Sequence, residues 1–181
     1  MPWDATILEQ FRLISRVSAD ESQYYGPYIT LLTNLFPHTE HYQLSLGPAA
    51  PRSIDLTIVH IIPQVGLMTP VLPIEIQPHT HLHDLAMREK ADNRMRDRFR
   101  ELNCPDHPLR KIYGISVMGT RFAVYEYMRV TNRIAPPSIP RDPDIVNDVA
   151  PKARWEYDLL DPDGEAKFRS IVAKVKAIVE H

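Results

Sequence analysis

The chain has 181 residues, of which 44% are hydrophobic and 24% charged, the composition of an ordinary globular protein. This length fits one domain with a sizeable core and is short for two. A formal net charge of −2 excludes the strong positive excess of proteins that bind nucleic acid by phosphate attraction alone. A single cysteine, Cys104, excludes an intramolecular disulfide framework and is typical of a reducing compartment.

The first residues lack the basic and apolar regions of a secretory signal peptide. No apolar run approaches the ~20 residues that a membrane-spanning helix needs. We therefore expect an intracellular protein, cytoplasmic or nuclear, without a membrane partner. Association of two copies as a homodimer is compatible with this composition.

The first half of the chain predicts two helices followed by three strands. Asp4 can cap a first helix, whose apolar residues recur at helical spacing up to Val17. A second helix is predicted over about 20–35 and ends before Pro37. The predicted strands span residues 42–46, 54–62 and 71–77.

The second half predicts a helix, a hairpin and a last helix. The helix covers about 82–102, and its apolar stripe consists of Met87, Ala91, Met95, Phe99 and Leu102. Two strands, 112–117 and 121–127, flank a tight turn at Gly119. The proline-rich connection 130–152 is expected to wrap the surface or to carry function. A turn at 161–164 and a helix over 164–180 complete the chain.

The main chemical signal is a carboxylate in each of two neighbouring predicted strands. Asp55 lies within Ile54–Val59 and Glu75 within Val71–Ile76, where aliphatic and β-branched residues otherwise predict buried strands. A charge in such a strand is costly unless it is paired or holds a cation. We expect the two carboxylates to lie on one sheet face, close enough to share a divalent cation. Gln77 follows Glu75 by two residues and therefore projects from the same face.

An acid on one strand and Glu-x-Gln on the next, preceded and followed by a helix, resemble the PD-(D/E)XK nuclease superfamily. The resemblance covers about residues 18–128. Segments 21–27, 88–99 and 112–122 look like those of uncharacterised fungal members with a degenerate motif. The resemblance implies a restriction-endonuclease-like α/β fold, with a mixed sheet flanked by helices, and Mg²⁺ or Mn²⁺ as cofactor.

In that family an acidic pair binds the metal, and a lysine positions or activates the attacking water. The resemblance implies that Asp55, Glu75 and the backbone carbonyl of Ile76 hold the cation. Gln77 occupies the lysine position, where it can orient a water but cannot stabilise a developing anion by charge. Glu21, in the first turn of the second helix, either joins the metal site by resemblance or merely favours the helix N-terminus. Alternatively, Asp55 and Glu75 simply face solvent at strand ends.

Two cations of the helix 82–102 could take the place of the absent lysine. Arg88 lies at the border of the apolar stripe and can reach back over the sheet, where it would bind a phosphate rather than act as a base. Lys90 lies further from the stripe. The basic residues of 88–100 are otherwise typical of a solvated helix with i,i+4 ion pairs.

Histidines alternate at positions 79, 81 and 83, just before this helix. On an extended segment, His79, His81 and His83 would face one way and could bind zinc. The interpretation that we favour is a surface loop ending in a helix cap. His60, five residues after Asp55, is expected on the opposite face of the sheet.

These patterns predict one α/β domain over residues 1–181. The predicted function is that of an Mg²⁺-dependent nuclease or a degenerate relative that still binds nucleic acid. The alternative is a non-catalytic intracellular interaction or effector module on the same fold. Asp55 and Glu75 favour the enzyme, whereas Gln77 and the net charge favour the module.

Overall fold

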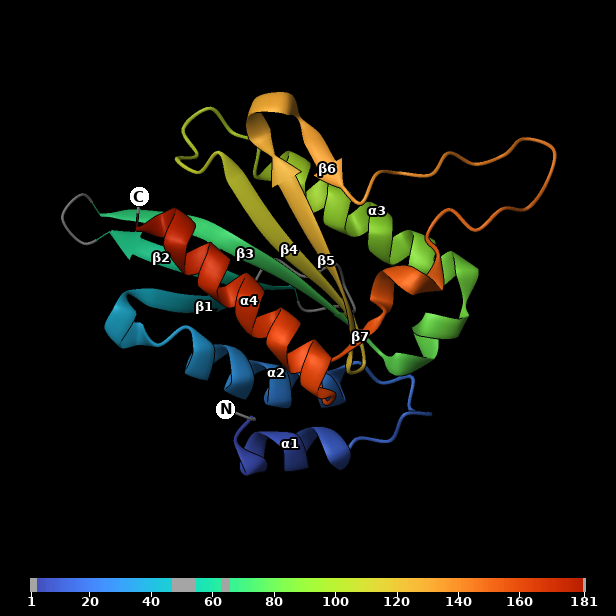
Figure 1. Ribbon diagram of the computed structural model, residues 1–181, viewed down its shortest axis with the longest axis horizontal. Coiled ribbons are helices and arrows are strands. Elements are labelled where there is room, and N and C mark those ends of the chain that lie inside the picture. The colour runs from blue at the N-terminus through green and yellow to red at the C-terminus, as the bar shows by residue number, and fades with distance from the viewer. Residues whose placement is uncertain (1–2, 47–54, 63–65, 181) are drawn as a thin grey trace.

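The computed structural model describes residues 3–46, 55–62 and 66–180, whose helices and strands are shown in Figure 1. The helices are α1 (Ala5–Arg12), α2 (Ser22–Leu35), α3 (Leu85–Glu101) and α4 (Pro162–Val179). The strands are β1 (Tyr42–Leu46), β2 (Asp55–Ile62), β3 (Leu67–Gln77), β4 (Lys111–Met118), β5 (Arg121–Met128), β6 (Arg133–Ala135) and β7 (Tyr157–Asp158). The predicted α/β class is confirmed.

The strands of the described residues form one mixed sheet in the order β1-β2-β3-β4-β5-β6, with β7 also paired to β5. β1, β2 and β3 are antiparallel to one another. β4 pairs with β3 in parallel, because the chain crosses over through α3 before it re-enters the sheet. β5 returns beside β4 around a two-residue turn, in which Gly119 adopts a φ of +69° that favours glycine.

Helices cover both faces of the sheet, with α1, α2 and α4 on one side and α3 on the other (Figure 1). The larger core packs Tyr28 and Phe168 against strand residues such as Ile74. On the other face, α3 comes close to β4 because Gly114 has no side chain. A Cβ there would lie 2.5 Å from the sulfur of Met95.

Several predicted boundaries differ from those observed. α1 begins after Asp4, whose carboxylate accepts a hydrogen bond from the Thr6 amide, but it ends well before Val17. α3 begins three residues later than predicted, because Asp84 caps it by accepting hydrogen bonds from two backbone amides. The turn predicted at 161–164 is instead the start of α4, with Pro162 in its first turn. The first residue of the predicted strand 54–62 lies outside the described residues.

The proline-rich connection 130–152 contains the short strand β6, which the sequence did not predict. The rest projects beyond α3 and returns to it (Figure 1). Two arginines of α3 hold it: Arg88 contacts Asp148 at 2.6 Å, and Arg96 donates to the carbonyl of Pro136 at 2.7 Å. Contacts with α3 therefore hold the projecting part of the connection at both of its ends.

A buried ionic cluster fixes the same segment to the sheet. Asp92 of α3 accepts hydrogen bonds from Arg96 at 2.8 Å and from the Tyr125 hydroxyl at 2.8 Å, and it also pairs with Arg154. Burial and the neighbouring Asp92 charge raise the pKa of Tyr125. Asp92 is 5% exposed, and burying a carboxylate is costly without such partners.

Across the described ranges 3–46, 55–62 and 66–180, none of the helices has the length and apolar character required to cross a bilayer.

Candidate functional site

The two predicted carboxylates meet at one end of the β2–β3 pair. Asp55, the first residue of β2, stands directly opposite Glu75 in the antiparallel register. Directly opposed residues project from the same face, so the expectation that the acids share a face is confirmed. Ile74 and Ile76, which flank Glu75, belong to the core on the α4 side. Glu75 and Gln77 therefore face α3.

Glu75 is buried in an unusual electrostatic setting. Its side chain is 3% exposed, and its Oε2 atom has no hydrogen-bond partner in the described structure. Burial raises the pKa of Glu75 to about 8, and the negative charge of Asp55 acts in the same direction. The prediction that it faces solvent at a strand end is wrong. Asp55, with 23% of its side chain exposed, lies nearer the surface.

Arg94 of α3 lies over the carboxylate pair. Its Nη2 atom is 2.7 Å from Oδ1 of Asp55, and its Nε atom is 3.9 Å from Oε1 of Glu75. Arg98, one turn further, donates to the Thr57 hydroxyl at 3.3 Å. Both guanidinium groups lower the pKa of Glu75, but the effect of burial is larger. The long Arg94–Glu75 contact is consistent with a carboxyl that keeps its proton near neutrality.

Glu21 lies just before α2, at the helix N-terminus where the helix dipole favours a carboxylate, but its side chain makes no capping hydrogen bond. Its Oε1 atom accepts a hydrogen bond of 2.6 Å from the Tyr25 hydroxyl instead. Burial raises the pKa of Glu21, and the charges of Arg94 and Asp55 also act on it. Glu21 is therefore a third acid near the pair.

Gln77 is buried next to Glu75, and only the oxygen of its side-chain amide forms a hydrogen bond. Its Oε1 atom accepts from Nδ1 of His81 at 2.9 Å, whereas its Nε2 atom has no partner in the described structure. Burial lowers the pKa of His81, which favours the neutral ring. Two adjacent side chains of β3 thus present an unsatisfied acceptor and an unsatisfied donor on the α3 face.

The three alternating histidines do not form one site. They lie in a 3₁₀ helix (His79–His83) rather than an extended segment, because Pro78 ends β3 and the chain turns at once. His81 points to Gln77, whereas the rings of His79 and His83 pack edge to face, with their centroids 5.9 Å apart. The extended segment is therefore wrong and the predicted loop is a 3₁₀ helix, but the predicted helix cap is confirmed, because Asp84 accepts hydrogen bonds from the Ala86 and Met87 amides.

Arg88 does not replace the absent lysine. Arg88 is buried and donates to the carbonyls of Leu82 and Ala150, away from the carboxylates. Lys90 is exposed. The cation that reaches the site is Arg94, which follows Met87 by seven residues, almost two whole turns. Helical spacing therefore places Arg94 on the same side of the helix as Met87, although the candidates predicted from the sequence were only Arg88 and Lys90.

The donors present fit a divalent cation with few protein ligands. Asp55 and the unpartnered Oε2 of Glu75 supply two carboxylate oxygens, and the Ile76 carbonyl is the third oxygen implied by the resemblance. Within the described part of the chain, no three His, Cys, Asp or Glu side chains are arranged as a metal-binding group. Mg²⁺ suits such a sparse set, because it keeps several waters and binds substrate oxygens.

No family model, curated protein or solved structure matches this chain.

Proposed function

We propose that the protein is a Mg²⁺-dependent nuclease of the PD-(D/E)XK type, or a degenerate relative that still binds nucleic acid. The observation that carries the proposal is the directly opposed Asp55–Glu75 pair, with a buried and unpartnered Glu75 oxygen. The order of α2, three antiparallel strands, α3 and a strand parallel to β3 is similar to that expected of a restriction-endonuclease-like core.

In this proposal Asp55, Glu75 and the Ile76 carbonyl hold the cation, with Glu21 as a neighbouring acid. A bound Mg²⁺ supplies Lewis-acid polarisation of a phosphoryl oxygen and lowers the pKa of water. Glu75 must release its proton to serve as a ligand, so cation binding is linked to proton release. The unsatisfied amide nitrogen of Gln77 can donate to a water or a phosphate oxygen.

Arg94 supplies the positive charge that Gln77 lacks. Its guanidinium already contacts both carboxylates, and it offers a fork that matches a phosphate. Arginine does not act as a base at neutral pH, so its role is limited to charge stabilisation. Activation of the attacking water would be inefficient compared with a lysine-containing site.

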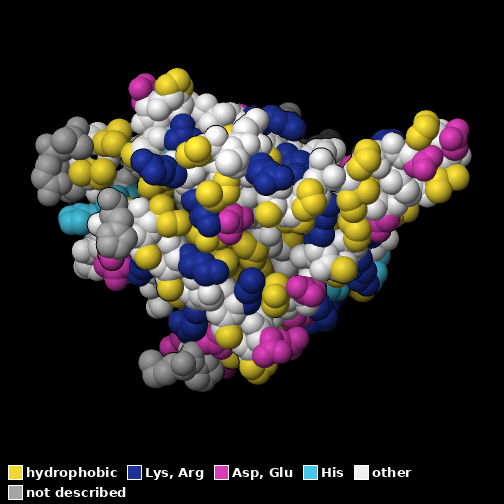
Figure 2. Space-filling model, turned by 45° about the horizontal axis from the view of Figure 1, so that its top comes forward, with side chains coloured by type: hydrophobic (Ala, Val, Ile, Leu, Met, Phe, Trp, Pro, Cys, Tyr) yellow, Lys and Arg dark blue, Asp and Glu magenta, His cyan; other side chains and the backbone are white. Residues whose placement is uncertain are grey.

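The second candidate, a non-catalytic interaction module, is favoured by the same arginine. The ion pair between Arg94 and Asp55 supplies within the protein the positive charge that a metal would otherwise provide. On the face in Figure 2, Lys and Arg are interspersed with apolar side chains, and acidic side chains are also present. The net charge of −2 agrees with this.

The substitution Gln77→Lys tests which of the two proposed functions is correct. If the site is a nuclease weakened by the absence of lysine, the substitution should raise Mg²⁺-dependent cleavage of single- or double-stranded DNA or RNA by about a hundredfold, because an ammonium stabilises developing charge. Glu75→Ala in the Gln77→Lys background should remove this cleavage, and activity that survives it would indicate a contaminating nuclease. No cleavage by Gln77→Lys, in protein shown to bind Mn²⁺, would instead support the interaction module.

A further inference from the structure

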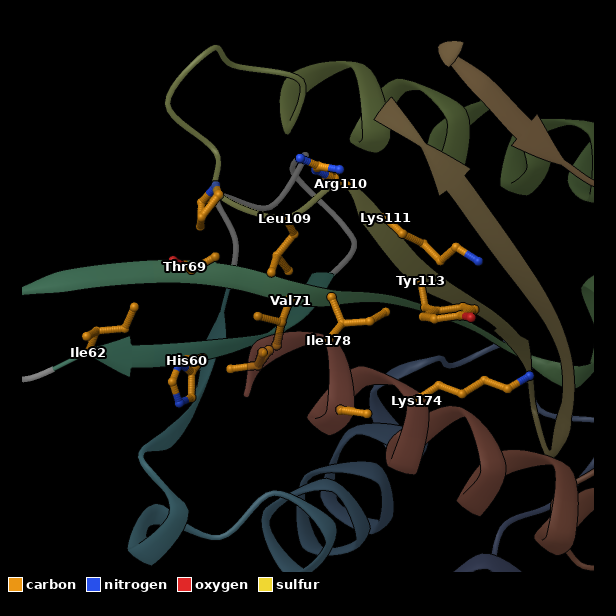
Figure 3. Close-up of a pocket in the computed structure, with 13 residues that line it drawn as sticks. His60, Ile62, Thr69, Val71, Leu109, Arg110, Lys111, Tyr113, Lys174 and Ile178 are labelled. Atoms are coloured by element: carbon orange, nitrogen blue, oxygen red, sulfur yellow. The ribbon is translucent and has the colours of Figure 1, made fainter. Parts of the chain in front are cut away.

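A groove lies between the C-terminal half of α4, the first residues of β3 and the segment that leads into β4 (Figure 3). Its volume of about 900 Å³ lies in the range of small-molecule binding sites. Much of the lining is aliphatic, with side chains from four separate segments: Ile62, Val71, Leu109 and Ile178. The groove therefore offers an apolar surface for a ligand with an alkyl body.

A β-bulge in β3 positions part of this lining. The register against β2 skips Val71, so the side chains on the two sides of this residue change their alternation. Thr69 and Val71 consequently face α4, whereas Glu75 and Gln77 further along face α3. Thr69 stands opposite His60, which also lines the groove. The groove thus lies at the other end of β2 and β3 from the carboxylates, and on the other face.

The charge of the groove is entirely of one sign. Arg110, Lys111 and Lys174 line it, and no Asp or Glu does. Lys111 is compensated by Glu126 at 2.6 Å. Arg110 and Lys174 are exposed, and neither forms an ion pair with any of the described residues. Two uncompensated cations therefore border an apolar surface.

A buried polar atom in the lining also lacks a partner. Thr69 is 4% exposed, and its hydroxyl has no hydrogen-bond partner among the described residues. Buried polar groups are normally satisfied, so an unsatisfied hydroxyl in the wall of a groove is accounted for by a ligand that supplies the partner. An anionic headgroup would accept this hydrogen bond.

We propose that the groove binds a monomeric anionic amphiphile of the fatty-acid type. Its alkyl chain packs on the aliphatic lining. Arg110 neutralises its carboxylate and the Thr69 hydroxyl supplies a buried donor, whereas Lys174, on the other side of the groove, adds to the positive charge that favours an anion. A nucleotide fits less well, because the lining has no carboxylate for ribose hydroxyls or base amines. This proposal is independent of the nuclease proposal.

Isothermal titration with decanoate, below its critical micelle concentration, tests the proposal. We expect one decanoate per chain, bound at least tenfold more tightly than decyltrimethylammonium, which has the same tail and the opposite charge. The double substitution Arg110→Glu and Lys174→Glu should weaken decanoate binding at least tenfold. Arg12→Glu, which changes an exposed arginine outside the groove, should leave it unchanged.

A steric variant tests the location separately from the charge. Ala177 is an exposed groove residue on α4, so Ala177→Trp should fill the groove without disturbing the core and should abolish binding. Its melting temperature, compared with that of the wild type, verifies folding. Thr69→Val keeps the side-chain shape, removes the donor and should weaken binding severalfold. The proposal would be overturned if decanoate did not bind, or if the cationic amphiphile bound with equal affinity. It would also be overturned if decanoate binding survived Ala177→Trp, or if the protein bound only to phosphatidylglycerol vesicles.

Discussion

Glu75 illustrates two opposing effects on one residue. The positive charges of Arg94 and Arg98 favour its ionised form, whereas burial and the negative charge of Asp55 favour the neutral form. Burial is the largest of these effects, and the pKa of about 8 follows from it. A carboxyl with this pKa keeps its proton through most of the neutral range and releases it as the pH rises.

This pKa predicts how stability depends on pH. Between the ordinary pKa of 4.5 and about 8, the folded protein holds a proton on Glu75 that the unfolded chain has lost. The free energy of unfolding should therefore decrease as the pH rises through this window, by up to about 1.4 kcal/mol per unit from this group. Urea titrations between pH 5 and 8 in EDTA should show the decrease in wild type and a smaller one in Glu75→Gln. Identical slopes would contradict the assigned pKa.

At the same scale, the sequence indicated the acids but not the cation that meets them. Alternation in the strands placed Asp55 and Glu75 on one face, because strand periodicity is strict and their strands are neighbours. The choice of Arg88 failed because its partners, the Ala150 carbonyl and Asp148, come from a connection whose path depends on tertiary packing. Helical spacing allows both Arg88 and Arg94 to lie over the sheet, and tertiary packing decides which of them reaches the carboxylates.

Among the elements, α3 contributes different residues to the candidate site and to the buried ionic cluster. Arg94 and Arg98 extend over the carboxylate end of β2 and β3, while Asp92 and Arg96 belong to the buried cluster that holds the proline-rich connection. A change in the cluster should therefore affect stability first and the candidate site only through the position of the helix.

Asp92→Asn should destabilise the protein by about 3–5 kcal/mol, because Arg96 and Arg154 would lose a buried counter-charge. The matched control is Asp97→Asn on the same helix, where an exposed ion pair with Arg100 is lost and the change should stay below about 1 kcal/mol. Chemical denaturation measures both. Equal, small effects would show that the Asp92 cluster is not a major source of stability.

The elements that the sequence predicted well are those with strong periodicity or local signals. The hairpin around Gly119 follows from its turn residues, and the body of the last helix follows from its apolar spacing. The histidine segment was mistaken because a 3₁₀ turn has no hydrophobic pattern of its own. β6, only three residues long, forms through pairing with β5, and its own residues do not predict it.

On the scale of the whole molecule, β2 and β3 connect two chemically different regions. Their α3 side carries the carboxylates, and the α4 side at their other end carries the cationic, apolar groove (Figures 1 and 3). Sequence alternation separated His60 from Asp55 correctly. It could not reveal the groove, because the bulge at Val71 and the approach of α4 are tertiary features.

Thermal unfolding with and without Mg²⁺ or Mn²⁺ tests the central claim, that Asp55 and Glu75 form a cation site. At a cation concentration 100-fold above Kd, binding to the folded state alone adds about 2.7 kcal/mol, or roughly 5–10 °C in Tm for a chain of this size. We predict this rise at pH 8 in the wild type and its loss in both Asp55→Asn and Glu75→Gln. Arg94→Gln, which removes the competing guanidinium, should retain or enlarge the rise. No rise in the wild type, or the same rise in wild type and Asp55→Asn, would contradict the account.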